Sequence, residues 1–232
     1  MAANIDILYE DNHLIIINKP AGLPSQGDLT TDACAIDLVK DYIKKEYKKP
    51  GNVYAGLVHR IDRPVSGVLM LCKTSKALTR MSEQFKNRSI KKTYLAVTHK
   101  PFNHERRHLE HHLIKDRRRN ISKVVHPRHK KGKHAELYVE SVSKSDEYTL
   151  LRVSPITGRS HQIRVQLSAV GYPIVGDVKY RGQKHADRRG ICLHSHELTF
   201  HHPTTKEEIT VRCLPDQSHW RPYEQLLAHV EE

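Results

Sequence analysis

Apolar residues occur in short runs throughout this chain, and the longest run, at residues 68–72, reads Val-Leu-Met-Leu-Cys. A membrane-spanning helix needs roughly 20 predominantly apolar residues, so the sequence predicts no such span. A short continuous apolar run is instead typical of a strand that is buried on both faces. This feature favours a protein built around a buried sheet.

Other segments with strand-like or helix-like patterns follow one another without strict alternation. This order favours an α+β fold with a mixed, mainly antiparallel sheet and flanking helices. Strands are predicted at residues 5–9, 13–18, 53–58, 67–73, 93–97, 135–142, 148–153, 191–200 and 208–214. Helices are predicted at residues 32–47, after an N-cap at Ser75, between an N-cap at Ser160 and Gly171, and at residues 224–230.

The chain length and the cysteines narrow the class of protein further. A chain of 232 residues suits one large domain or two small ones, and it can bury a core without disulfides. The four cysteines are far apart and form no Cys-x-x-Cys motif, so neither a zinc site nor a disulfide framework is predicted. We expect reduced, mostly buried thiols and a cytoplasmic location, because the N-terminus also lacks the pattern of a signal peptide.

Positive charge is concentrated in two segments. The chain carries 39 Lys and Arg against 26 Asp and Glu, a net charge of +13. Residues 104–134 hold eleven basic and three acidic residues, a net of +8, and residues 72–92 hold seven and one, a net of +6. The remaining chain therefore has a net charge of 13 − 14 = −1. These two basic blocks favour RNA or DNA as a partner, with a solvated surface as the alternative.

The basic block at residues 104–134 shows little hydrophobic periodicity. We therefore expect it to contain a mobile loop.

Several familiar motifs are missing from the chain: Gly-x-Gly-x-x-Gly, the P-loop and His-Glu-x-x-His. The 18 histidines include adjacent pairs, which point in different directions on a regular element, so no metal site is predicted.

The stretch His-Arg-Ile-Asp-Arg-Pro-Val-Ser-Gly at residues 59–67 is the strongest candidate for chemistry. Asp62 lies between Arg60 and Arg63, and a carboxylate beside fixed cations stays ionised and can serve as a nucleophile or base. The residues alone leave a second interpretation equally open: a structural Asp62 in an ion-pair network or a turn.

This stretch resembles the His-Arg-Leu-Asp-x-x-Thr/Val-Ser-Gly signature of the RluA-type RNA pseudouridine synthases. Further resemblances to that family lie at residues 7–24, 91–97, 157–164 and 171–177, so the similarity spans about residues 5–214. It implies one pseudouridine synthase catalytic domain over residues 1–232, with a basic insertion at about 104–134. It also implies the compact form of the family, which lacks the N-terminal RNA-binding domain of some relatives.

The resemblance implies an enzyme that isomerises specific uridines of ribosomal or transfer RNA to pseudouridine. It assigns Asp62 as the catalytic carboxylate, Tyr94 as the tyrosine that stacks on the base, and Arg164 as the arginine that pairs with the carboxylate. An enzyme cannot reach a base inside a stack, so the target nucleotide must be flipped out. The resemblance assigns Arg60 as the arginine that fills the space which this nucleotide leaves. The alternative is a non-catalytic RNA-binding or RNA-folding protein on the same scaffold.

Further RNA contacts are expected from both the motifs and the basic block. No cofactor and no metal are expected, and we predict a monomer whose partner is RNA and not a membrane. His161 and Gln162 fit helix caps as well as RNA contacts, and Asp177 fits a turn better than a functional role. The predicted RNA-binding residues besides Arg60 are His59, Arg159, His161, Gln162, Arg117, Arg118 and Arg119.

Overall fold

The structure is a computed structural model, and it describes residues 5–27, 33–184 and 190–230. The chain divides into two compact units, each made of two stretches of sequence. The first unit is Met1–Lys92 with Ser195–Pro215, and the second is Thr93–His194 with Asp216–Glu232. The expectation of a single catalytic domain with an insertion stays a prediction.

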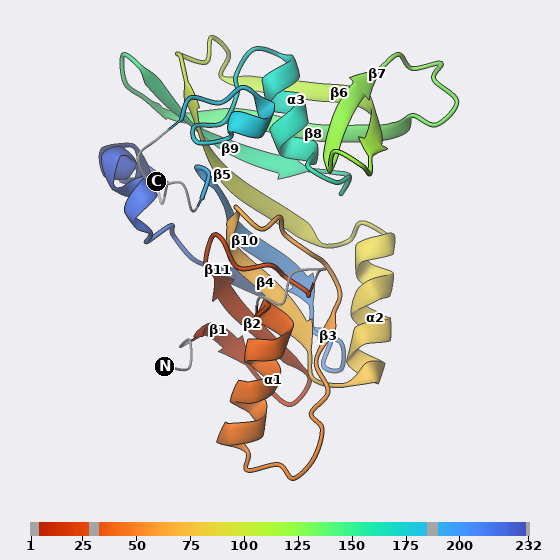
Figure 1. Cartoon of the computed structure of the whole chain (residues 1–232). Coiled ribbons are helices and arrows are strands. Elements are labelled where there is room, and N and C mark those ends of the chain that lie inside the picture. Colours follow the sequence, from red (N-terminus) through yellow and green to blue (C-terminus); the bar gives the residue numbers. More distant parts are fainter. Residues whose placement is uncertain (1–4, 28–32, 185–189, 231–232) are drawn as a thin grey trace. The chain divides into compact units, whose positions relative to one another are not determined.

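The first unit contains strands in the neighbour order β1-β2-β4-β10; β11 pairs with β10, and β3 pairs with β4 (Figure 1). The pairs β1–β2, β2–β4, β3–β4 and β10–β11 are antiparallel. Every residue of β2 and β4 is buried, which explains their continuous apolar sequences. The strands of this sheet are β1 (Asp6–Glu10), β2 (Leu14–Lys19), β3 (Gly56–Leu57), β4 (Ser66–Cys72), β10 (Leu193–His201) and β11 (Glu208–Arg212).

Two helices belong to the first unit: α1 (Ala35–Glu46) and α2 (Ser75–Lys86) (Figure 1). Ala77 and Met81 of α2 join the buried core with residues of β2, β4, β10 and β11. The prediction that Ser75 caps α2 was wrong by one residue. The cap is Thr74, whose hydroxyl accepts a hydrogen bond from the backbone N–H of Ala77 at 3.1 Å.

The second unit contains antiparallel strands in the neighbour order β5-β9-β8-β6-β7. Val165 of α3 packs with Leu113, Ala135 and Tyr180 in a small core. The elements of this unit are β5 (Lys91–His99), β6 (Arg106–Asp116), β7 (Ile121–Val125), β8 (Lys133–Lys144), β9 (Tyr148–Pro155), α3 (Gln162–Ala169) and α4 (Glu224–Leu227), with 3₁₀ helices η1 (Val178–Tyr180) and η2 (Ser218–Tyr223).

The predicted fold class is confirmed: the strands form a mixed, mostly antiparallel sheet arrangement with few helices. The basic block differs from expectation, because most of it forms β6, β7 and the start of β8, and only residues 104–105, 117–120 and 126–132 lie outside these strands. Only Leu109 and Leu113 of β6 are buried, so its hydrophobic pattern is too sparse to reveal a strand. Two other predicted elements, at residues 53–58 and 224–230, are shorter than expected. No helix in the described ranges has the length and apolarity that crossing a membrane requires.

Gly67, at the start of β4, cannot carry a side chain without strain. Its φ is +107°, and an added Cβ would lie 2.2 Å from the carbonyl oxygen of Ser195. We therefore predict that Gly67→Ala lowers the free energy of unfolding by at least about 2 kcal/mol, since backbone strain and overpacking each cost about 1–3 kcal/mol. Chemical denaturation measures this loss. Gly27→Ala is the control, because nothing lies within 4 Å of its added Cβ; equal stability of the two variants would contradict the prediction.

Candidate active site

The loop that carries Asp62 lies between β3 and β4 and is fastened on both sides of this residue. The hydroxyl of Ser25 donates to the carbonyl of Ile61 at 2.8 Å and accepts from its N–H at 3.3 Å. On the other side, the N–H of Gly22 donates to the carbonyl of Arg63 at 2.7 Å, and the Arg63 guanidinium donates to the carbonyl of Gly22 at 2.9 Å. The backbone around Asp62 is thus held by a second loop, at residues 20–25.

Lys19, at the end of β2, joins these two loops from inside the fold. It is fully buried, and its ammonium donates to the carbonyls of Pro20 and Leu23, each at 2.7 Å, and of Arg63 at 3.4 Å. Burial lowers the pKa of Lys19 to about 7, while the negative charge of Asp62 acts in the opposite direction. The sequence reasoning missed this residue, although a lysine directly after an apolar strand and before a proline is an available signal.

His59 and Arg60 precede Asp62 and differ in their surroundings. Arg60 is exposed. The Nε2 atom of His59 accepts the N–H of Met70 at 3.0 Å, and its ring stacks on Phe85 with centroids 4.9 Å apart. Burial lowers the pKa of His59 to about 3, so the ring is neutral at ordinary pH. Its contacts within the unit hold the loop against β4 and α2, and its predicted contact with RNA stays a prediction.

Arg164 lies in the second unit, on α3, and it is almost fully buried. Its guanidinium donates to both carboxylate oxygens of Asp177, at 2.7 and 2.8 Å, and lies 5.0 Å from the ring centre of Tyr180. Asp177 precedes η1, as a turn residue would, but its side chain is also buried in this ion pair. The expectation that Asp177 mainly forms a turn therefore missed its contact with Arg164.

The three predicted catalytic residues are divided between the two units. Asp62 belongs to the first unit, whereas Tyr94 in β5 and Arg164 belong to the second. The pairing of Asp62 with Arg164 that the resemblance implies stays a prediction. No group of three or more His, Cys, Asp or Glu side chains in the described part of the chain has the arrangement of a metal site.

Around the start of α3, the predicted RNA contacts also serve the local structure. The Gln162 amide oxygen accepts from the hydroxyl of Thr157 at 2.7 Å and the N–H of Arg159 at 2.9 Å, and its NH₂ donates to the carbonyl of Glu136 at 3.0 Å. His161 adopts a φ of +53°, and its Nδ1 lies 2.7 Å from the hydroxyl of Tyr180. These contacts fix the turn before α3, and the RNA-binding roles stay predictions.

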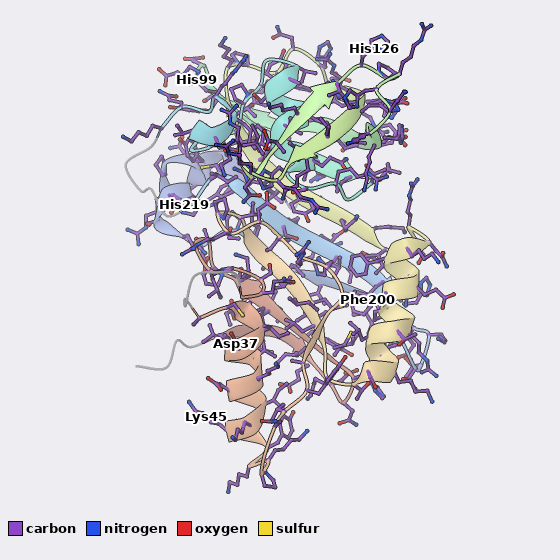
Figure 2. The ribbon with its side chains drawn as sticks, turned by 45° about the vertical axis from the view of Figure 1, so that its right-hand side comes forward. Asp37, Lys45, His99, His126, Phe200 and His219 are labelled. Carbon is purple, nitrogen blue, oxygen red and sulfur yellow. The ribbon has the colours of Figure 1, made fainter. Side chains whose placement is uncertain are left out.

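The three arginines at residues 117–119 lie in the turn between β6 and β7, and all three are exposed. Asp116 fixes this turn, because its carboxylate accepts the N–H of Arg119 at 3.0 Å. A second loop of the basic block follows β7 and begins at His126, which is labelled in Figure 2. Six of the eleven basic residues of the block thus lie in these two loops, and the other five lie on β6, β7 and β8.

Comparison with known proteins identifies the family. The profile of the family described as RNA pseudouridylate synthase matches residues 13–169, which is more than half of the chain. This chain belongs to the RNA pseudouridylate synthase family. The predicted family and the predicted enzyme class, an isomerase that acts on RNA, are thereby confirmed.

Relatives of this synthase cover most of its sequence. Ribosomal large subunit pseudouridine synthase C of Buchnera aphidicola subsp. Acyrthosiphon pisum is 37% identical over 217 residues, which cover 90% of this chain and 67% of the relative. The uncharacterized RNA pseudouridine synthase YlyB of Bacillus subtilis is 32% identical, and the match covers 92% of this chain and 70% of the relative. The synthase thus matches about two thirds of the length of these relatives.

The fold of the synthase also matches a solved structure. Human RNA Pseudouridylate Synthase Domain Containing 4 aligns with a TM-score of 0.80 at 24% identity, covering 96% of this chain and 93% of the human chain. At that identity the match concerns the fold alone, and it agrees with the mainly antiparallel sheets described above.

The buried ion pair of the second unit yields a stability prediction. We expect Asp177→Asn to lower the free energy of unfolding by about 3 kcal/mol, because it removes the charged partner of a buried guanidinium. Thermal and chemical denaturation measure the change. Asp146→Asn is the matched control, since Asp146 is exposed in the same unit and forms no hydrogen bond or ion pair with any described residue. A loss of equal size in both variants would show that the pair contributes nothing specific.

Proposed function

We propose that this synthase isomerises specific uridines in ribosomal or transfer RNA, with Asp62 as the catalytic carboxylate and Arg60 assisting base flipping. The observation that carries the proposal is the fastened loop: Asp62 lies between two residues whose backbones are hydrogen-bonded to a neighbouring loop, while Arg60 beside it is exposed. A carboxylate on a fastened backbone, two residues from an exposed arginine, suits an enzyme that extrudes a nucleotide and acts on it.

The reaction breaks the bond between ribose C1′ and N1 of uracil and forms a bond between C1′ and C5. The proton lost from C5 is balanced by a proton gained at N1, so the conversion needs no co-reactant. In this proposal Asp62 assists cleavage at C1′, Tyr94 stacks on the detached base, and Arg164 balances the carboxylate charge. The Arg60 plane stacks in the space that the extruded nucleotide leaves, as arginine planes do on bases.

Ribosomal RNA is the favoured substrate, because several relatives are named ribosomal large subunit pseudouridine synthases. Mapping pseudouridine in ribosomal and transfer RNA from host cells with and without this gene tests the choice. Loss of a pseudouridine only from transfer RNA would overturn it. The monomeric state and the cytoplasmic location remain predictions from the sequence.

The role of Asp62 is tested by Asp62→Asn, which removes the carboxylate charge but keeps the shape of the side chain. We expect RNA binding of the same order as in the wild type and no pseudouridine, measured by mass spectrometry of the product RNA. Asp41→Asn, on the exposed side of α1, serves as the control and retains activity. Pseudouridine formed by Asp62→Asn at the wild-type rate would disprove this mechanism, whereas an inactive wild-type protein that still binds RNA would favour the non-catalytic alternative.

The turn between β6 and β7 is proposed to contact the RNA backbone through Arg117, Arg118 and Arg119. Each phosphate contact contributes about 0.7–0.9 to the slope of log affinity against log salt. Replacing all three arginines with Gln should therefore weaken RNA binding and reduce this slope by about 2–3. RNA titrations at several salt concentrations measure it.

The matched control replaces three exposed lysines at the end of α1 with Gln: Lys44, Lys45 and Lys48. Lys45 is labelled in Figure 2. This control removes the same charge from the other unit, so it measures the effect of net charge alone. If both triple variants change the slope equally, the arginine turn makes no specific contact.

A further inference from the structure

Three basic side chains of the first unit gather where α2 ends and β5 begins. They are Lys92 in β5, Arg88 just after α2, and His59 in the loop before Asp62. The ring of His59 stacks on Phe85, in the last turn of α2, and Arg88 follows the end of α2 by two residues, so both lie at this end of the helix. The positive charge of Arg88 lowers the pKa of Lys92, and the charge of Lys92 lowers that of His59. No carboxylate contributes to either shift.

Lys92 is partly buried, and the reason lies in the local sequence. Ile90 is buried in the core with α2 and β4, Lys91 is exposed, and Lys92 is again partly buried. This alternation, which is typical of a strand, directs Lys92 towards the protein and Lys91 towards solvent. Burial is the largest cause of the lowered pKa of Lys92.

The Lys92 ammonium has no hydrogen-bond or ion-pair partner among the residues that the structure describes. The end of α2 does not supply one. Its last carbonyls, those of residues 83–85, accept hydrogen bonds from the N–H groups of Asn87, Arg88 and Ser89. His59 cannot accept from Lys92 through Nε2, which already accepts from Met70. Partly buried cations are normally paired, so the position of Lys92 suits an anion that a ligand supplies.

We propose that Lys92 and Arg88 bind one backbone phosphate of the substrate RNA. An RNA phosphodiester fits because the protein acts on RNA and because the segment at residues 72–92 carries a net charge of +6. His59 precedes Arg60 in the chain, so the bound phosphate would lie near the nucleotide that Arg60 helps to extrude. This last point rests on the proposed function, whereas the phosphate site itself does not.

The test compares two neighbouring lysines whose replacement removes the same charge. RNA binding is measured with an unmodified transcript of the host's large-subunit ribosomal RNA. We expect Lys92→Gln to raise the Kd about 5- to 10-fold at 0.1 M salt and to reduce the salt slope by about 0.7–0.9, the effect of one phosphate contact. Lys91→Gln, on the exposed side of the same strand, should change the Kd less than about twofold.

A second measurement separates binding from a structural role. Removing a poorly solvated charge beside Arg88 relieves repulsion, so the Lys92→Gln protein should have a melting temperature equal to or above that of the wild type. Lys92→Arg should retain most of the RNA affinity, because it keeps the charge. Arg88→Gln, at an exposed position, should weaken binding in the same direction as Lys92→Gln without affecting folding.

Equal Kd values for Lys92→Gln and Lys91→Gln would overturn the phosphate site, as would a lower melting temperature of Lys92→Gln together with unchanged RNA binding. Either result leaves the role of Asp62 untouched, because that role is judged from product formation by Asp62→Asn. Loss of product in Asp62→Asn with unchanged binding in Lys92→Gln would therefore support the proposed function and reject only this inference.

Discussion

The buried ammonium of Lys19 is the interaction on which the candidate site of the first unit depends. It donates to backbone carbonyls of both loops that surround Asp62, at Pro20, Leu23 and Arg63. The Arg63 carbonyl also accepts from the N–H of Gly22, and the hydroxyl of Ser25 holds Ile61. Together with these contacts, one buried side chain links two segments that lie outside helices and strands.

Buried and partly buried cations are used in three different ways in this protein. Lys19 is satisfied by neutral carbonyls, and Arg164 is satisfied by the carboxylate of Asp177. Lys92 has neither kind of partner among the described residues and lies near Arg88. The free energy of burying the charge differs among the three, because a desolvated cation is stabilised only by the carbonyls or carboxylates near it. Lys19 and Arg164 thus stabilise the fold, whereas Lys92 is the cation for which we propose an RNA phosphate as the partner.

The sequence predicted the fold class and most strands because buried strands leave continuous or alternating apolar patterns. It failed for the basic block, where β6 buries only Leu109 and Leu113 among charged residues. Motif resemblance located Asp62, but not its support, because the hydrogen bonds of Lys19 and Ser25 run to backbone atoms. A backbone acceptor is not tied to a residue type, so the only available signal was the position of Lys19 after an apolar run and before a proline. The structural roles of Gln162 and Asp177 were not predicted for a related reason. Gln162 donates to a carbonyl of β8, and Asp177 accepts from Arg164 of α3, so the partners lie on other elements.

Each unit is assembled from two separated stretches of sequence, and this affects the order in which the protein can form during synthesis. The strand β10 neighbours β4 in the first unit, yet Ser195–Pro215 leaves the ribosome only after Thr93–His194 has been made. Residues 93–194 supply nearly all strands of the second unit, so that sheet can form first. The N-terminal stretch, which carries Asp62, lacks the strands β10 and β11 of its sheet until Ser195–Pro215 has been synthesised. During synthesis from the N-terminus, the sheet of the second unit can therefore be completed before the sheet of the first unit.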